Sequence, residues 1–256
     1  MKRIFIPLFL FLFLLNGTMQ AQSTKIKKKN PYQLLAEKYL PEVRKSIARK
    51  HPRLFYSKAL FEEFKRKAQE PLLKSRLEYL QKKTLQTYQE LLSYTDKNNG
   101  LEEKLPAGSQ WHPIGNFGII AGRSAFFYHL TGEKKWAEIS IDLMKRFSSY
   151  YRKRVALGRA VNWYGWGRIM HIMAWDYLYD VMTPADRDAI AGEILDHVKW
   201  LSNRKEVAKL CKVGEGLNSP GSGFYSAHCM VPWYAGIVFG NAGYEDSFAE
   251  QCLENG

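Results

Sequence analysis

The chain has 256 residues, of which 46% are hydrophobic and 14% aromatic; this composition is typical of a packed globular protein and excludes a disordered one. Its net charge of +13 is unevenly distributed, because residues 22–100 hold 19 basic and 8 acidic side chains whereas residues 101–256 hold 17 of each. The positive excess is therefore N-terminal, in the run KIKKKN and on the solvated faces of predicted helices.

The first 21 residues are typical of a secretory signal peptide. Lys2 and Arg3 form a basic start, Ile4–Leu15 is an apolar run of 12 residues, and Asn16–Ala21 is polar and ends in a small residue. The apolar run is well short of the roughly 20 residues that a spanning helix needs. We therefore expect a periplasmic or secreted protein with no permanent membrane anchor, for which nucleic acid is a poor candidate partner.

The N-terminal third predicts helices. Residues 22–50 form a basic segment and a first helix, Tyr32–Lys50, interrupted by Pro41. Ser57 is expected to cap a helix through KALFEEFKRKAQ, and Pro71 to open one that runs through Leu92 and stops in TDKNNG.

The rest of the chain predicts pairs of helices with short connections and no strand-rich region. Thr131 and Gly132 separate the first pair, and Thr183 caps the second helix of the next. WAE at 136–138 has a counterpart in FAE at 248–250, which suggests a ring or solenoid of helical hairpins. The predicted helices are Ile114–Leu130, Trp136–Phe147, Trp163–Val181, Pro184–Trp200, His228–Phe239 and one from Glu245 onward.

Between Asp142 and Asp176 the sequence has seven cations, no acid and several aromatic residues. Cations that pair with carboxylate or sulfate, beside rings that stack on sugar faces, suit a polyanionic glycan. The alternative is a basic loop over core aromatics. The candidate substrate-binding residues, with two from the loop before residue 114, are Trp111, His112, Arg159, Asn162, Trp163, Trp166 and Arg168.

Three segments resemble secreted polysaccharide lyases of the heparinase II/III and alginate lyase type: HPRLFYSKALFEEFKRKAQEP, YHLTGEKKWAE and AWDYLYDVMTPADRDAI. The resemblance implies an all-α fold, an incomplete (α/α) toroid of helical hairpins over residues 51–256. In the family a β-sandwich usually follows the toroid, and it does not fit in this length of chain. The three segments are not catalytic, so they indicate fold more than activity.

The resemblance also implies cleavage of a uronic-acid glycan by β-elimination. This reaction requires neutralisation of the C6 carboxylate, removal of the C5 proton and protonation of the leaving O4. In the family an Asn-His pair at a helix start binds the carboxylate, and tyrosine or histidine moves the protons. His228 matches that histidine, with Ala227 where the family often has asparagine, and Tyr225 and Tyr164 are the candidate proton carriers.

Two alternatives remain open. A glycoside hydrolase would need two carboxylates across the scissile bond. Asp176 and Asp180 lie one turn apart and could share a helix face, but the resemblance implies that they are structural and tie the helix end to its neighbours. An exported helical-repeat protein, or an inactive lyase remnant, would bind anionic glycan without cleaving it.

No metal or cofactor is expected. The three cysteines, Cys211, Cys229 and Cys252, are too few and too widely spaced for a disulfide framework or a zinc site. One pair could oxidise after export, or all three could be buried thiols that behave as small apolar groups.

Overall fold

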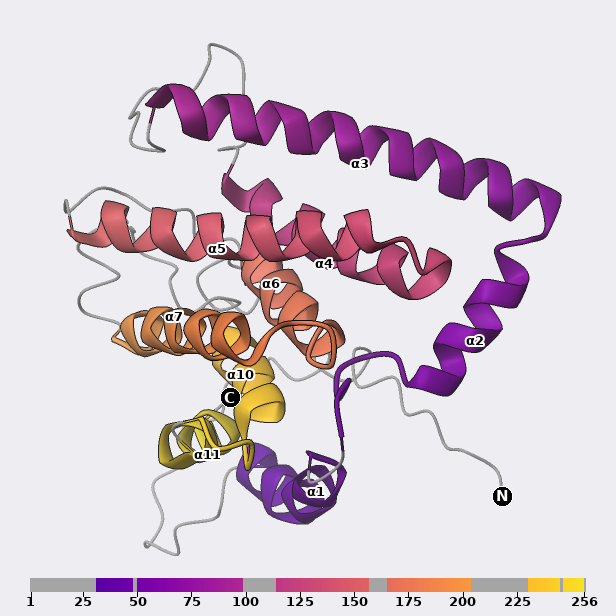
Figure 1. The fold of residues 1–256 in the computed structure, drawn as a ribbon. Helices are drawn as coiled ribbons and strands as arrows, with labels where there is room; N and C mark the ends of the chain where they lie inside the picture. The colour runs from indigo at the N-terminus through magenta and orange to yellow at the C-terminus, as the bar shows by residue number, and fades with distance from the viewer. Residues whose placement is uncertain are drawn as a thin grey trace, which may run out of the picture.

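The computed structural model of the chain describes residues 31–47, 50–98, 114–156, 165–203, 230–244 and 246–255. Across these six ranges the chain forms nine α-helices and no β-strand (Figure 1). The predicted all-α class is therefore confirmed. The helices are α1 (Pro31–Ile47), α2 (Lys58–Lys67), α3 (Pro71–Asn98), α4 (Ile114–Thr131), α5 (Lys134–Ala156), α6 (Gly165–Tyr177), α7 (Pro184–Ser202), α10 (Val231–Phe239) and α11 (Asp246–Asn255).

Helix starts follow the predicted caps. The Ser57 hydroxyl accepts a hydrogen bond from the Leu60 amide at 3.3 Å, and the Thr183 hydroxyl accepts one from Asp186 at 3.1 Å. Each bond satisfies an amide that has no partner inside the helix.

Helix lengths differ from the prediction at α1, α5 and α6, whereas α3 ends where it was predicted to end. α1 continues through Pro41 without interruption, α5 runs beyond Phe147 to Ala156, and α6 ends at Tyr177 rather than at Val181. α3 ends at Asn98, inside the predicted stop TDKNNG. The added stretch of α5, SSYYRKRVA, contains neither proline nor glycine, so no residue in it breaks a helix that is already formed.

Helical hairpins stack in two layers. The first helices α4, α6 and α10 contact one another in sequence, α4 with α6 and α6 with α10 (Figure 1). The second helices follow them: α5 contacts α7, and the Lys199 ammonium of α7 lies 5.6 Å from the Phe248 ring of α11. We call α4, α6 and α10 the inner layer, and α5, α7 and α11 the outer layer.

Glycines at the turns shape the first and last of these hairpins. Gly132 between α4 and α5 has φ 73°, and Gly243 between α10 and α11 has φ 80°. Glycine adopts this left-handed backbone without the steric cost that a Cβ brings. The two hairpins that carry WAE and FAE therefore both turn at a glycine with a left-handed backbone. This shared feature agrees with the similarity of the two hairpins in sequence.

The inner helices α4 and α6 run parallel with their N-terminal ends side by side. A Cβ added to Gly118, near the start of α4, would stand 1.8 Å from the carbonyl oxygen of Gly167, near the start of α6. One turn later, a Cβ on Gly122 would stand 2.8 Å from the Met170 carbonyl oxygen. At the other end of the layer the Trp175 ring of α6 lies 4.6 Å from the Phe239 ring of α10.

The remaining helices surround this stack. α2 and α3 both pack against α4, with α3 the longest helix along one side of the molecule (Figure 1). α1 packs against the last hairpin: Ile47 is buried in the common core, and Arg44 Nε donates to Glu250 at 2.8 Å. The first helix therefore contacts the C-terminal hairpin, although the predicted boundary at residue 50 separates them.

Candidate functional site

The start of α6 carries the two predicted site residues that the structure describes. Trp166 is 53% exposed, whereas Arg168, two residues on, is 2% exposed. An exposed tryptophan in the first turn of a helix offers an aromatic face to a ligand such as a sugar ring. A direct contact between the buried Arg168 guanidinium and a glycan stays a prediction.

Arg168 belongs to a buried cluster of basic side chains between α6 and α7. Its Nε donates to Nε2 of His197 at 2.8 Å, and the His197 ring stacks on Trp200 with centroids 5.7 Å apart. Since Nε2 of His197 accepts, this ring must be neutral with its proton on Nδ1. Burial first, then the charge of Arg168 and proximity to His171, lowers the pKa of His197 well below 6.5.

His171 lies one turn after Arg168 on α6. It is buried with its ring edge-on to Phe147 at 4.7 Å, and its Nε2 has no hydrogen-bond partner among the residues that the structure describes. Burial lowers the pKa of His171 to about 3, because the charged ring would lose its hydration. His171 is therefore a core residue with one ring nitrogen that has no hydrogen-bond partner among the described residues.

The other eight candidate residues lie outside the described residues: His228, Tyr225, Tyr164, Trp111, His112, Arg159, Asn162 and Trp163. Along the sequence each belongs to one of three connections, which lead into α4, α6 and α10. All three of those helices form the inner layer. These candidate residues therefore precede the first helix of each hairpin, which is the helix of the inner layer.

Comparison with known proteins finds no matching family model, no similar curated protein and no similar solved structure.

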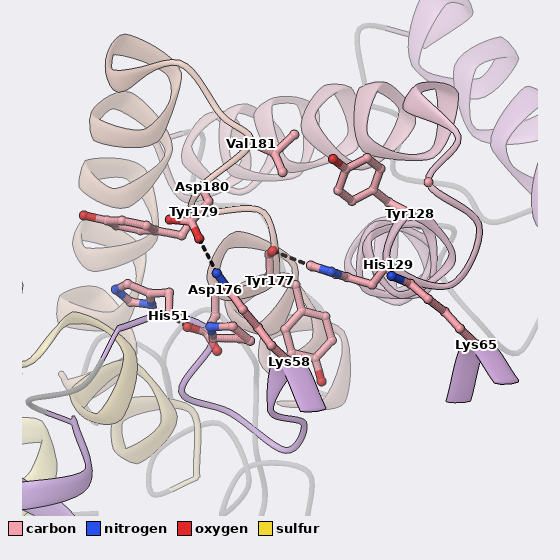
Figure 2. A pocket seen from close by; sticks show the side chains of 12 residues that line it. His51, Lys58, Lys65, Tyr128, His129, Asp176, Tyr177, Tyr179, Asp180 and Val181 are labelled. Atoms are coloured by element: carbon pink, nitrogen blue, oxygen red, sulfur yellow. Dashed lines mark hydrogen bonds and ion pairs between the residues drawn. The ribbon is translucent and has the colours of Figure 1, made fainter. Parts of the chain in front are cut away.

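A pocket of about 240 Å³ lies at the opposite end of the inner layer, where α4 and α6 end (Figure 2). Its twelve lining residues come from three places: four from residues 51–71, three from 128–138 and five from 174–190. These ranges coincide with the three segments on which the sequence-based expectation of a lyase scaffold rests. Segments far apart in the sequence thus meet in one structural unit.

Asp176 holds this end together. It is fully buried and its carboxylate accepts hydrogen bonds from the Arg53 amide at 2.8 Å and the Leu54 amide at 2.8 Å, and pairs with His51 Nδ1 at 2.5 Å. Arg53 in turn donates through Nη1 to carbonyls at the end of α10, including Val238 at 3.0 Å. We call these four residues, His51, Arg53, Leu54 and Asp176, the Asp176 network.

The charged side chains at the rim of the pocket form pairs with neighbouring groups of the protein. Figure 2 shows Lys58 reaching Asp180, with Nζ 2.9 Å from Oδ2, and His129 Nε2 bonded to the Tyr177 carbonyl oxygen at 2.7 Å. Burial, outweighing this hydrogen bond, lowers the pKa of His129. Lys65 pairs with Glu62 at 2.6 Å. The predicted role of Asp176 and Asp180, tying the helix end to its neighbours, is confirmed.

The predicted basic run is partly neutralised by acids elsewhere in the chain. Lys145 Nζ lies 2.6 Å from Asp186, Arg152 pairs with Glu193, and Arg146 Nε lies 2.9 Å from Asp142. Asp186 and Glu193 belong to α7, about 40 residues away in sequence. Cations in a stretch of sequence without acidic residues therefore have acidic partners in the folded protein.

Among the described residues, no group of three or more histidine, cysteine, aspartate or glutamate side chains could hold a metal ion. Within the same ranges, no helix combines the length and apolar character needed to cross a membrane. Cys252 is a free, buried thiol whose pKa burial raises to about 12; Cys211 and Cys229 lie outside the described residues.

Proposed function

We propose that this protein is an exported polysaccharide lyase that cleaves an anionic, uronic-acid-containing glycan by β-elimination. The observation that carries the proposal is the close parallel contact of α4 and α6 at their N-terminal ends, through Gly118 and Gly167. All ten candidate residues lie in the connections that lead into inner helices or in the first turns of α6. Their predicted groove would then follow one edge of the inner layer.

The fold supports this proposal in two ways. Hairpins stacked with first helices inside and second helices outside are the repeating unit of an (α/α) toroid, and we propose that residues 51–256 form an incomplete one. The three segments that carry the family resemblance also meet around one pocket. Both observations concern the fold, because the three segments indicate fold more than activity.

The proposed reaction breaks the C5–H and C4–O bonds of a uronate and forms a C4–C5 double bond. A base takes the C5 proton, the electron pair of that bond forms the double bond, and the leaving O4 receives a proton from an acid. In this scheme His228 neutralises the C6 carboxylate, which stabilises the charge that develops beside it. Tyr225 and Tyr164 are the candidate base and acid.

Trp166 would stack on a sugar ring at the start of α6, because its side chain is the exposed aromatic group described at this edge. Trp111, Trp163, His112, Asn162 and Arg159 would line the same groove. Arg168 has a different surrounding: its bond to His197 suits a residue that supports the first turn of α6 from the interior.

The hydrolase alternative receives no support from the described geometry. Asp176 is fully buried and its oxygens accept hydrogen bonds from two backbone amides, so a sugar cannot reach its carboxylate. Asp180 lies at the same end of α6, paired with Lys58. Asp176 and Asp180 therefore do not form the pair of carboxylates across a glycosidic bond that a hydrolase needs.

The decisive test is ultraviolet absorbance of the unsaturated product. The chain from Gln22 to Gly256 would be mixed with alginate, heparan-type and other uronic polymers; we expect absorbance to rise with one of them. His228→Ala should lower that rate at least a hundredfold, whereas His129→Ala, at the opposite end of the inner layer, should leave the rate per folded molecule within about twofold.

Two results would contradict the proposal. A folded protein that retains glycan on a column but gives no absorbance with any polymer would be a non-catalytic glycan-binding protein. Equal turnover by His228→Ala and the unsubstituted chain would remove the catalytic assignment of that histidine. Thermal unfolding of both variants is the control for loss of fold.

A further inference from the structure

The corner between α2 and α3 projects from the rest of the molecule and exposes leucine. Figure 1 shows the two helices meeting away from the stacked hairpins. At this corner Leu72 is 82% exposed and Leu73 is 43% exposed, and Tyr79 follows two turns later with 49%. Large apolar groups gathered on one projecting edge are a common mark of an interaction surface.

These leucines take no part in the contact that holds α3. α3 packs against α4, and its buried residues Thr84 and Leu91 lie further along the helix. Thr84 also lies within 3.5 Å of Arg123 on α4. The N-terminal turns of α3 extend beyond that contact, so the core does not explain the apolar residues at the corner.

Basic residues outnumber acidic ones in the two helices that form the corner. Between residues 62 and 83 the chain has seven basic side chains, Lys65, Arg66, Lys67, Lys74, Arg76, Lys82 and Lys83, against four acidic ones, Glu62, Glu63, Glu70 and Glu78. Two of these cations pair with neighbouring carboxylates, Lys65 with Glu62 and Lys67 with Glu63. Outside these two pairs the corner keeps five cations against two acids, Glu70 and Glu78.

We propose that the α2–α3 corner, residues 62–83, is a surface that binds bilayers containing anionic lipid. Leucine side chains enter the boundary between headgroups and acyl chains, while lysine and arginine remain at the level of the anionic headgroups. The leucines decide between partners, because a soluble polyanion would use the cations and leave Leu72 and Leu73 in water. Tyr79, with Arg76 5.2 Å from its ring, suits the same interface.

This binding is peripheral and separate from the proposed catalysis. The corner belongs to α2 and α3, whereas the candidate residues precede or begin the inner helices. The inference therefore stands whether or not the chain cleaves a glycan.

Co-sedimentation with lipid vesicles tests it directly. The chain from Gln22 keeps every described helix and lacks the apolar run Ile4–Leu15, which would bind lipid by itself. We expect at least tenfold stronger partitioning into vesicles of equal phosphatidylglycerol and phosphatidylcholine than into phosphatidylcholine alone. High salt should weaken the binding.

Two double variants separate the apolar and charged contributions. Leu72→Ser with Leu73→Ser should weaken partitioning about tenfold at unchanged charge, and Lys74→Glu with Arg76→Glu should weaken it by a similar factor or more. Lys134→Glu with Lys135→Glu makes the same charge change at the start of α5 and should stay within about twofold of the unsubstituted chain. All six positions are exposed, so the fold should survive each change.

Three outcomes would overturn the inference. The unsubstituted chain could fail to bind anionic vesicles; the serine variant could bind as well as the unsubstituted chain, which would assign the corner to soluble polyanions; or the α5 control could lose as much binding as the α3 charge variant, which would reduce the effect to net charge.

Discussion

Asp176 is a carboxylate without access to water, and its surroundings explain why it is stable there. Two backbone amides and one imidazole point at its oxygens. The hydrogen bonds to water that the carboxylate loses on burial are therefore replaced by bonds to groups that the fold holds in place. The donors come from residues more than 120 positions earlier in the chain. One side chain thus fixes the segment His51–Leu54 on the end of α6.

Replacing this carboxylate should destabilise the protein much more than replacing its neighbour. Asp176→Asn turns one acceptor oxygen into a donor that faces other donors, and we expect a loss of about 3 kcal/mol of unfolding free energy. Asp180→Asn removes an exposed pair with Lys58 and should cost less than about 1 kcal/mol. Urea unfolding of both variants measures the difference; equal losses would show that the Asp176 network is not the main support of this end.

Contacts between side chains that are far apart in the sequence could not be predicted. An acid-free stretch could be read from the order of residues, but its partners Asp186 and Glu193 could not, because they approach only when α5 packs on α7. The bond between Arg168 and His197 has the same origin. Local composition therefore overstates free charge wherever a helix packs against a distant acidic one.

At the scale of single elements, helix starts were predicted better than helix ends. Ser57 and Thr183 cap the helix that follows within three residues, so the signal is local and readable. Ends were predicted less well: TDKNNG marks the end of α3 at Asn98, but α5 passes beyond Phe147 to reach Ala156. At α6 the opposite holds: the helix ends at Tyr177, and turns follow to Val181 although the apolar pattern continues.

The contact of α4 with α6 gives a sharp test at this scale. Gly118→Ala should cost about 1–3 kcal/mol, since its methyl group would overlap the Gly167 carbonyl and push the two helices apart. Gly192→Ala is the matched control on α7, where a Cβ meets nothing within 4 Å; it should stabilise by about 0.5–1 kcal/mol through helix propensity. Thermal or urea unfolding measures both. Equal small effects would mean that the inner helices separate without cost.

At the scale of the whole molecule, the all-helical class and the pairing of helices followed from periodicity and turn residues. The arrangement in layers did not, because it depends on which hairpin faces which. Nor could the sequence show that the three family-like segments gather at the end where α4 and α6 terminate. Along α6, Trp166 and Asp176 are ten residues and about 15 Å apart, so the two ends of the layer are distinct places.

The buried histidines make global stability depend on pH. In the folded protein His171 has a pKa of about 3, whereas in the unfolded chain it is about 6.5. Below pH 6.5 the unfolded state therefore binds a proton that the folded state does not, and stability falls as pH decreases, by up to about 1.4 kcal/mol per pH unit from this one group.

His171→Leu removes this titrating group and should flatten the decline between pH 6.5 and 4. Urea unfolding at several pH values compares the two proteins, and the carboxylates, common to both, cancel in the difference. Parallel stability curves would show that the His171 ring takes up a proton without unfolding.

Stability and proposed chemistry thus occupy opposite ends of one layer of helices. The described bonds of the Asp176 network join residues 51–54 to Asp176 and to the end of α10. If substrate preference is set at the starts of the inner helices, as proposed, it can diverge over evolutionary time without changes in these contacts, because the positions that select the substrate and the positions that form the contacts are not the same.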